Sequence, residues 1–147
     1  MMKKCAVVLC LLFCVVRVYG QADTSASWSS VQLWAKVENK PVFIYFSGSD
    51  WCGSCMLFKK HIMNDSTFSA YLSAGFVFYN ADFPARKKQD AQTVSDNEML
   101  AEHYNPSGAY PAMVILSPDG QLLGRIVYSN AKTVADYIAE LKKLKGQ

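Results

Sequence analysis

The strongest constraint in this sequence is a pair of cysteines three positions apart, in the run Trp51-Cys52-Gly53-Ser54-Cys55. The run follows an apolar stretch, 41–46, and precedes a helix-like stretch that begins near Met56. In the first turn of a helix, residues i and i+3 lie on one face, within bridging distance. Unpaired N–H groups and the macrodipole at that end favour a thiolate on Cys52, the form that attacks disulfides. The spacing therefore predicts that Cys52 and Cys55 make and break one disulfide. An inert structural bridge is the alternative, but so short a loop gains little closure entropy.

The first twenty residues have the pattern of a secretory signal peptide. Lys3 and Lys4 precede an apolar run over 5–16, and Val18-Tyr19-Gly20 supplies small residues for a cleavage site after Gly20. We expect a leader over 1–20, an exported protein, and one domain over 21–147. A retained membrane anchor is the alternative, although the apolar run is short for a span.

Removal of this leader would change both the charge and the cysteine content. The chain has 15 basic and 12 acidic residues, and Lys3, Lys4 and Arg17 lie in the leader, which leaves 12 of each sign. A neutral domain offers no broad basic field to nucleic acid or to an anionic membrane. Three of the five cysteines, at positions 5, 10 and 14, also lie in the leader. The remaining pair cannot build a conventional disulfide framework.

Hydrophobic patterns predict alternating helices and strands in one domain of substantial core. We expect helices over 27–39, 54–63, 68–75 and 97–104, a terminal helix from 131 through 144, and strands over 42–46, 76–81, 112–116 and 122–128. The last two strands form a hairpin around Asp119-Gly120. An α/β sandwich with one mixed sheet between helices is the simplest assembly.

Periodicity also predicts which helix faces point inward. In the first helix we expect Val31, Trp34 and Val37 on the buried face, with Leu33 beside them. The terminal helix places Val134, Tyr137, Ile138, Leu141 and Leu144 at helical spacing. We expect Asn130 to cap this terminal helix.

The polar stretch 82–97 is expected to be a surface loop. It carries the basic cluster Arg86-Lys87-Lys88, which we interpret as a solvated face, with a partner-docking patch as the alternative. Asp96 or Asn97 would cap the short helix that follows.

No metal site is predicted. Zinc would need two ligands besides the cysteines, and the only histidines, His61 and His103, stand where surface residues are expected. Cu(I) suits thiolates and thioethers, and Met56 follows Cys55 directly. A Cu(I)-handling or partner-binding module therefore stays as an alternative function. The methionines at 56, 63, 99 and 113 are expected in the core.

From about Lys40 to the C-terminus the sequence resembles the thioredoxin superfamily. The resemblance depends on four places in order: the strand and W-C-x-x-C junction, a strand ending in Asp82, Tyr110-Pro111 before a strand, and the Asp119-Gly120 hairpin before an amphipathic helix. It implies an α/β, thioredoxin-like three-layer sandwich with a central mixed β-sheet flanked by helices. Lys40 through Cys52 is most similar to exported thioredoxin-like proteins and to periplasmic reductase domains of transmembrane electron relays. The expected location is thus the periplasm, with secretion as second choice.

The resemblance also implies the roles of the site residues. Cys52 would attack and Cys55 would resolve the mixed disulfide, beside a flat apolar wall formed by Trp51. Pro111, if cis, would face the sulfurs and, with Tyr110, leave backbone free to pair with an extended substrate chain. We expect a protein-disulfide oxidoreductase that acts as a reductase, without an organic cofactor. Its partners would be protein thiols or disulfides and a membrane electron-relay reductase, and the domain would be a monomer.

One departure from the family concerns the proton path to Cys55. Many thioredoxins have a buried acid on the strand before the motif, whereas Tyr45 or Phe46 stands there in this chain. Proton transfer would then rely on water, on Tyr45, or on the loop 47–50, where Asp50 is the nearest carboxylate. An exposed loop acid is the simpler interpretation of Asp50.

Overall fold

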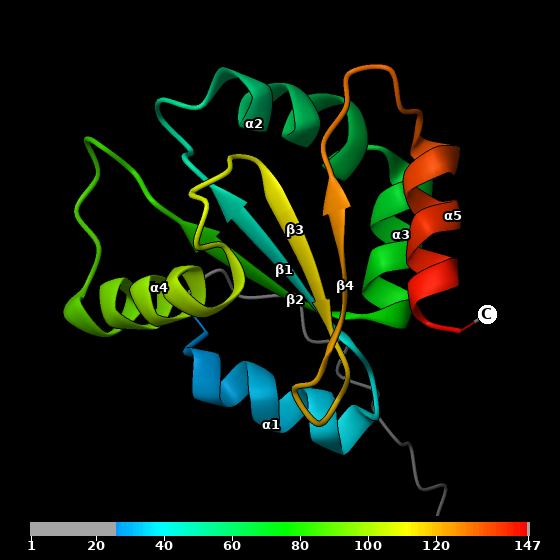
Figure 1. The fold of residues 1–147 in the computed structure, drawn as a ribbon, viewed down its shortest axis with the longest axis horizontal. Coiled ribbons are helices and arrows are strands. Elements are labelled where there is room, and N and C mark those ends of the chain that lie inside the picture. The colour runs from blue at the N-terminus through cyan, green and yellow to red at the C-terminus, as the bar shows by residue number, and fades with distance from the viewer. Residues whose placement is uncertain (1–25, 147) are drawn as a thin grey trace, which may run out of the picture.

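The apolar run before the cysteines forms β1 (Val42–Ser47), a strand whose six residues are all buried. The computed structural model describes residues 26–146, so the expected leader over 1–20 lies outside the described residues. The other elements are α1 (Trp28–Glu38), α2 (Gly53–Phe58), the π-helix η1 (Lys59–Met63), α3 (Ser66–Gly75), β2 (Val77–Asp82), α4 (Ala91–Tyr104), β3 (Ala112–Leu116), β4 (Leu122–Val127) and α5 (Val134–Leu144) (Figure 1). No helix within 26–146 is long and apolar enough to cross a membrane.

The four strands form one mixed sheet in the order β2-β1-β3-β4. β1 pairs in parallel with β2, and the ladder ends where Ser47 faces Asp82. β1 pairs antiparallel with β3, which in turn forms an antiparallel hairpin with β4. The expected mixed sheet flanked by helices is thus confirmed, and it carries the carboxyl ends of β1 and β2 to the same edge as the cysteines.

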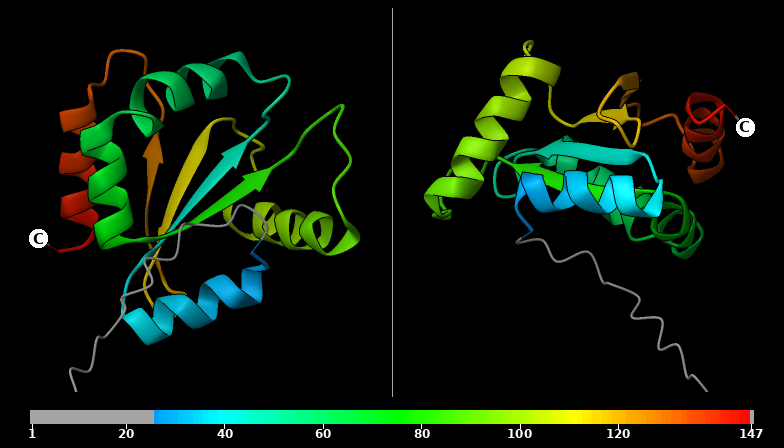
Figure 2. Two further views of the ribbon diagram at one scale, coloured as in Figure 1. Left: turned by 180° about the vertical axis from the view of Figure 1, so that it is seen from behind. Right: turned by 90° about the horizontal axis from the view of Figure 1, so that it is seen from below.

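Side chains alternate across the sheet and build a separate core on each face. Phe43 and Tyr45 of β1 contact the core that also contains the two cysteines and residues of α2, α3 and α5. Val42, Ile44 and Phe46 contact the other core, beneath α1 and α4. Figure 2 shows the helices distributed around the sheet, with α3 and α5 side by side. These two cores make the three layers of the sandwich.

The buried face of α1 differs from the predicted one. Trp28, Val31 and Ala35 are buried, whereas Trp34 is 45% exposed and Val37 is 75% exposed. Leu33, expected beside that face, is also exposed. Residues 28, 31 and 35 are spaced by three and four positions and form one face, which leaves Leu33, Trp34 and Val37 on the opposite side of the helix. The prediction for Trp34 and Val37 was therefore wrong.

Two predicted helix caps were also wrong. Asp90 caps α4 by accepting the backbone N–H of Thr93 at 2.9 Å. The helix therefore begins at Ala91, and the loop before it is shorter than the predicted 82–97. Asp96 and Asn97 are buried within that helix instead of capping it. α5 begins at a capping box in which Thr133 and Asp136 exchange bonds, and Asn130 has no part in it.

Buried polar contacts explain why Asp96 and Asn97 can lie inside a helix. Asp96 Oδ2 accepts the backbone N–H of Trp28 at 2.9 Å, so a residue of α4 binds the start of α1. Asn97 accepts the hydroxyl of Tyr79 at 2.8 Å and donates to the carbonyl of Asp82, also at 2.8 Å. Each buried group has a partner, which removes most of the cost of burial.

Candidate active site

Cys52 and Cys55 form a disulfide at the junction between β1 and α2. Their Cα atoms are 5.2 Å apart, and the side chains are 5% and 2% exposed. Cys52 is the N-cap residue of α2, and its sulfur accepts the backbone N–H of Cys55 at 3.2 Å. An N–H aimed at sulfur stabilises the charged form of a thiol, because hydrogen bonds to an ion favour that ion. The predicted bridge at a helix start is therefore present in the fold.

The predicted substrate wall gathers around this bridge from three segments of the chain. The indole of Trp51 is 49% exposed and makes an edge contact with Tyr110, with ring centroids 5.3 Å apart. Ser54 Oγ donates to the carbonyl of Tyr110 at 3.4 Å and lies 3.5 Å from the sulfur of Cys52. The Tyr110-Pro111 peptide is cis, the isomer that the X-Pro sequence permits. Trp51 and Tyr110 thus lie beside the cysteine pair, and Pro111 follows Tyr110 directly, while their contact with a substrate stays a prediction.

Gly48 leaves room for the indole of Trp51 beside the loop before the cysteines. A Cβ built on this buried residue would lie 2.6 Å from Nε1 of Trp51 and closer still to two ring carbons. Real Cβ atoms do not approach so closely, so any other residue would displace the ring. Sequence reasoning treated Gly48 only as part of a loop.

Tyr45 lies under the site as a hydrogen-bond donor. Its hydroxyl donates to the carbonyl of Cys55 at 3.1 Å. Burial, followed by the nearby charge of Asp82, raises the pKa of Tyr45 well above its ordinary value. A phenol that stays protonated serves poorly as a base. A proton-transfer role for Tyr45 stays a prediction, and the contacts favour a positioning role.

Asp50 binds a neighbouring loop. Its carboxylate accepts the N–H groups of Ala85 and Arg86, each at 2.8 Å. The bond from Ala85, and then the one from Arg86, hold the pKa of Asp50 below its ordinary value. A low pKa makes the carboxylate a weak proton acceptor. Both carboxylate oxygens of Asp50 already accept backbone N–H groups. A role in proton transfer stays a prediction.

The two loops that follow β1 and β2 are joined by reciprocal bonds, which we call the loop clasp (residues 47–51 with 82–86). Asp82 accepts N–H of Ser49 at 2.8 Å and its hydroxyl at 2.6 Å. The indole N–H of Trp51 donates to the carbonyl of Phe83 at 2.6 Å. In the opposite direction, the backbone N–H groups of Ala85 and Arg86 donate to the carboxylate of Asp50. The clasp fixes the approach to the cysteines, and sequence reasoning missed it because its partners are more than thirty positions apart.

Two apolar side chains that follow the cysteines on α2 are exposed. Met56 is 51% exposed and Leu57 is 49% exposed on the first turns of α2. Met56 and Met99 are therefore not core methionines, in contrast to the prediction, whereas Met113 is buried.

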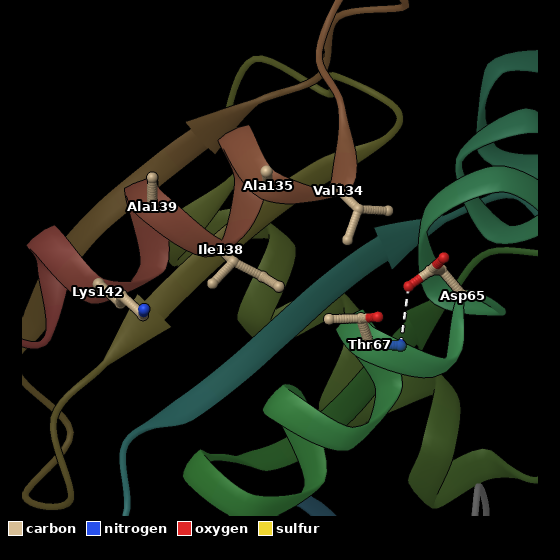
Figure 3. A pocket seen from close by; sticks show the side chains of 7 residues that line it. All are labelled: Asp65, Thr67, Val134, Ala135, Ile138, Ala139 and Lys142. Atoms are coloured by element: carbon tan, nitrogen blue, oxygen red, sulfur yellow. Dashed lines mark hydrogen bonds between the residues drawn. The ribbon is translucent and has the colours of Figure 1, made fainter.

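A second feature, a hollow of about 480 Å³, lies between the start of α3 and α5 (Figure 3). Asp65 at its edge caps α3 through N–H of Thr67, at 2.8 Å, and the floor comes from α5 residues such as Ile138. None of its lining residues belongs to the site around the disulfide. Within 26–146, no three His, Cys, Asp or Glu residues form a group that could hold a metal, and His61 and His103 are exposed.

Comparisons with known proteins agree with this geometry. The chain is 27% identical to the disulfide bond reductase DsbH of Chlamydia pneumoniae over 74% of its length, and 26% identical to the thioredoxin-related protein DsbJ of the same organism over 63%. It spans 64% of the length of the first relative and 26% of the second. A solved structure of a DsbH oxidoreductase superposes with a TM-score of 0.75 at 23% identity, covering 87% of this chain and 88% of that one. The family profile described as the thioredoxin-like domain matches residues 31–144. The chain therefore belongs to the thioredoxin-like domain family.

Proposed function

We propose that this protein is an exported thiol–disulfide oxidoreductase that reduces disulfides in protein substrates. The observation that carries the proposal is the sulfur of Cys52, which caps α2 and accepts N–H of Cys55 at 3.2 Å. That bond stabilises a thiolate at the sulfur that begins exchange. The family membership and the printed names of two relatives, a disulfide bond reductase and a thioredoxin-related protein, support the same chemistry.

The reaction transfers two electrons from the dithiol to the substrate. The Cys52 thiolate attacks one sulfur of the substrate disulfide, and the other substrate sulfur leaves as a thiolate that takes up a proton. Cys55, once deprotonated, attacks the sulfur of Cys52 in the resulting mixed disulfide. The second substrate thiol leaves, and the Cys52–Cys55 bridge forms. No organic cofactor takes part in these steps.

The substrate would lie as an extended chain between Trp51 and the cis-proline turn. Trp51 offers a half-exposed apolar face, and Tyr110 makes an edge contact with it at 5.3 Å. Backbone at Tyr110 and Pro111 would pair with substrate backbone, so that this contact does not depend on the side chains of the substrate.

Export and the source of electrons are parts of the same proposal. The leader pattern over 1–20 and the relationship to Dsb proteins support a periplasmic site of action, with secretion as second choice. A reductase there needs its disulfide reduced again after each turnover. A membrane electron-relay reductase is the partner that we propose, and the domain would act as a monomer.

Insulin reduction tests the proposal directly. Cys52→Ser should abolish turnover, while Cys55→Ser should trap a mixed disulfide through Cys52 that gel analysis without reductant detects. Cys→Ser in both positions should leave the far-ultraviolet circular dichroism unchanged, because the bridge spans only one helical turn. Undiminished turnover by Cys52→Ser would refute the assignment.

The direction of electron flow needs a separate measurement. Equilibration with glutathione should give a potential near that of thioredoxins, about −270 mV, whereas a value near about −120 mV is typical of a disulfide donor. Stoichiometric Cu(I) binding that is lost in Cys55→Ser, without thiol exchange, would instead support the Cu(I)-handling alternative.

A further inference from the structure

Three basic residues lie on the loop that the clasp attaches to the active site. Arg86, Lys87 and Lys88 are exposed, and the backbone N–H of Arg86 is bound by Asp50, the residue before Trp51. Figure 1 shows this loop, between β2 and α4, extending at the same end of the sheet as the loop that leads into α2. We call Arg86, Lys87 and Lys88 the basic triplet.

The carboxylates near the basic triplet are engaged elsewhere. Asp82 binds Ser49, Asp50 binds backbone N–H groups, and Asp90 accepts N–H and hydroxyl of Thr93 at 2.9 and 2.6 Å. The charge of Arg86 contributes to the lowered pKa of Asp50, yet the two form no ion pair. The ion pairs found within 26–146 join Lys40 to Glu38 and Lys132 to Glu140, so no side chain of the triplet forms one.

The clasp distinguishes this cluster from ordinary surface lysines. A loop whose charged side chains only face solvent needs no fixed position. This loop is hydrogen-bonded through Phe83, Ala85 and Arg86 to Asp50 and Trp51, just before Cys52. Outside the expected leader the chain carries equal numbers of basic and acidic residues. The three adjacent positive charges therefore do not reflect a general excess of basic residues in the domain.

We propose that the basic triplet is a docking surface for an acidic segment of the substrate protein, close in sequence to the cysteine that reacts with Cys52. This inference rests on the proposed function and adds a substrate class to it. Trp51 would hold the apolar part of the substrate beside the reacting sulfur, and the triplet would attract acidic side chains on the flank formed by the loop 83–90. Opposite charges on the two partners would raise the rate of productive encounter.

Two disulfide peptides test the inference with the full chain. They share one sequence around the disulfide and differ only in three flanking residues, Asp in one and Asn in the other. At about 0.05 M salt, kcat/KM should be about fivefold to tenfold higher for the Asp peptide, and the difference should vanish at about 0.5 M salt. In R86Q/K87Q/K88Q the preference should fall below about twofold, while the rate with the Asn peptide is unchanged.

A matched variant controls for net charge. K36Q/K142Q/K143Q removes the same three charges from exposed positions on α1 and α5, and it should keep the preference for the Asp peptide. Equal loss in both variants, or a preference that survives in R86Q/K87Q/K88Q, would overturn the inference. So would binding of the wild type to phosphatidylserine vesicles that needs the triplet, without any peptide preference. Equal reduction of both peptides by the wild type would overturn docking alone, whereas reduction of neither would overturn the proposed function as well.

Discussion

Replacing Gly48 with alanine should displace Trp51 from the wall of the site. The added methyl group would lie 2.6 Å from Nε1 of the indole and closer to two of its carbons, so the ring must move. The backbone of Gly48 has no positive φ, and alanine is therefore not strained in itself. Any effect of this substitution must come from the contact with Trp51.

The cost can be worked from the contacts that Trp51 would lose. The hydrogen bond from its N–H to the carbonyl of Phe83, 2.6 Å long, contributes about 0.5–1.5 kcal/mol. The edge contact with Tyr110 contributes about 0.5–1.5 kcal/mol. Because the indole is 49% exposed, we expect the lower half of that sum, about 1–2 kcal/mol, or a fall in Tm of about 3–8 °C.

A double-mutant cycle measures whether Trp51 carries the effect. Urea unfolding gives the free energies of Gly48→Ala, Trp51→Ala and the double variant, and insulin reduction gives KM and kcat for each. In the Trp51→Ala background the glycine substitution should cost less than about 0.5 kcal/mol, because the atoms it would strike are absent. KM should rise in Gly48→Ala, with kcat less affected. A cost that is equal in both backgrounds, or no cost in either, would refute the reasoning.

Three further predictions concern the loop before the cysteines, the start of α5 and the packing of α1. Asp50→Asn should make Tm fall less as pH is lowered from about pH 5 to pH 3. The fold lowers the pKa of Asp50, so its ionised carboxylate stabilises the folded state fully at pH values above the unfolded pKa. This stabilisation is lost as pH falls through the folded pKa. Thermal unfolding across that range would contradict this if both proteins lost Tm equally. Thr133→Ala should cost about 1 kcal/mol in urea unfolding, while Asn130→Ala, outside the capping box, should be neutral; a reversed order would disprove the cap. Trp28→Ala should cost about 3–5 kcal/mol and Trp34→Ala less than about 0.5 kcal/mol, and similar losses would show that α1 does not pack as described.

Sequence patterns were sufficient where the relevant residues are neighbours in the chain. The bridge between Cys52 and Cys55 depends on the spacing of one helical turn, and the hairpin depends on turn residues at 119 and 120. A proline after Tyr110 permits the cis peptide that the structure contains. Strand bounds followed from apolar runs and agree with the sheet within a residue or two.

Patterns failed where distant partners decide the outcome. Asp96 resembles a helix cap in sequence, yet it lies inside α4 because it bonds to Trp28, 68 positions earlier. Asp50 resembles a free loop acid, and its partners at 85 and 86 appear only when β1 and β2 lie side by side. The packing face of α1 likewise depends on the core that Trp28, Val31 and Ala35 share with the sheet. None of these contacts can be recognised from neighbouring residues in the sequence.

The division of the core by the sheet has a consequence for how the protein responds to its own chemistry. Both reactive sulfurs belong to the core shared with α3 and α5, and the core beneath α1 and α4 contains no sulfur among the described residues. Along β1, Tyr45 contacts the first core and Ile44 the second. Opening the bridge should therefore alter amide hydrogen exchange in α3 and α5 while α1 and α4 keep their protection factors. Tyr110 packs against both cores, so we expect a change in exchange on the α1 and α4 side only next to that residue.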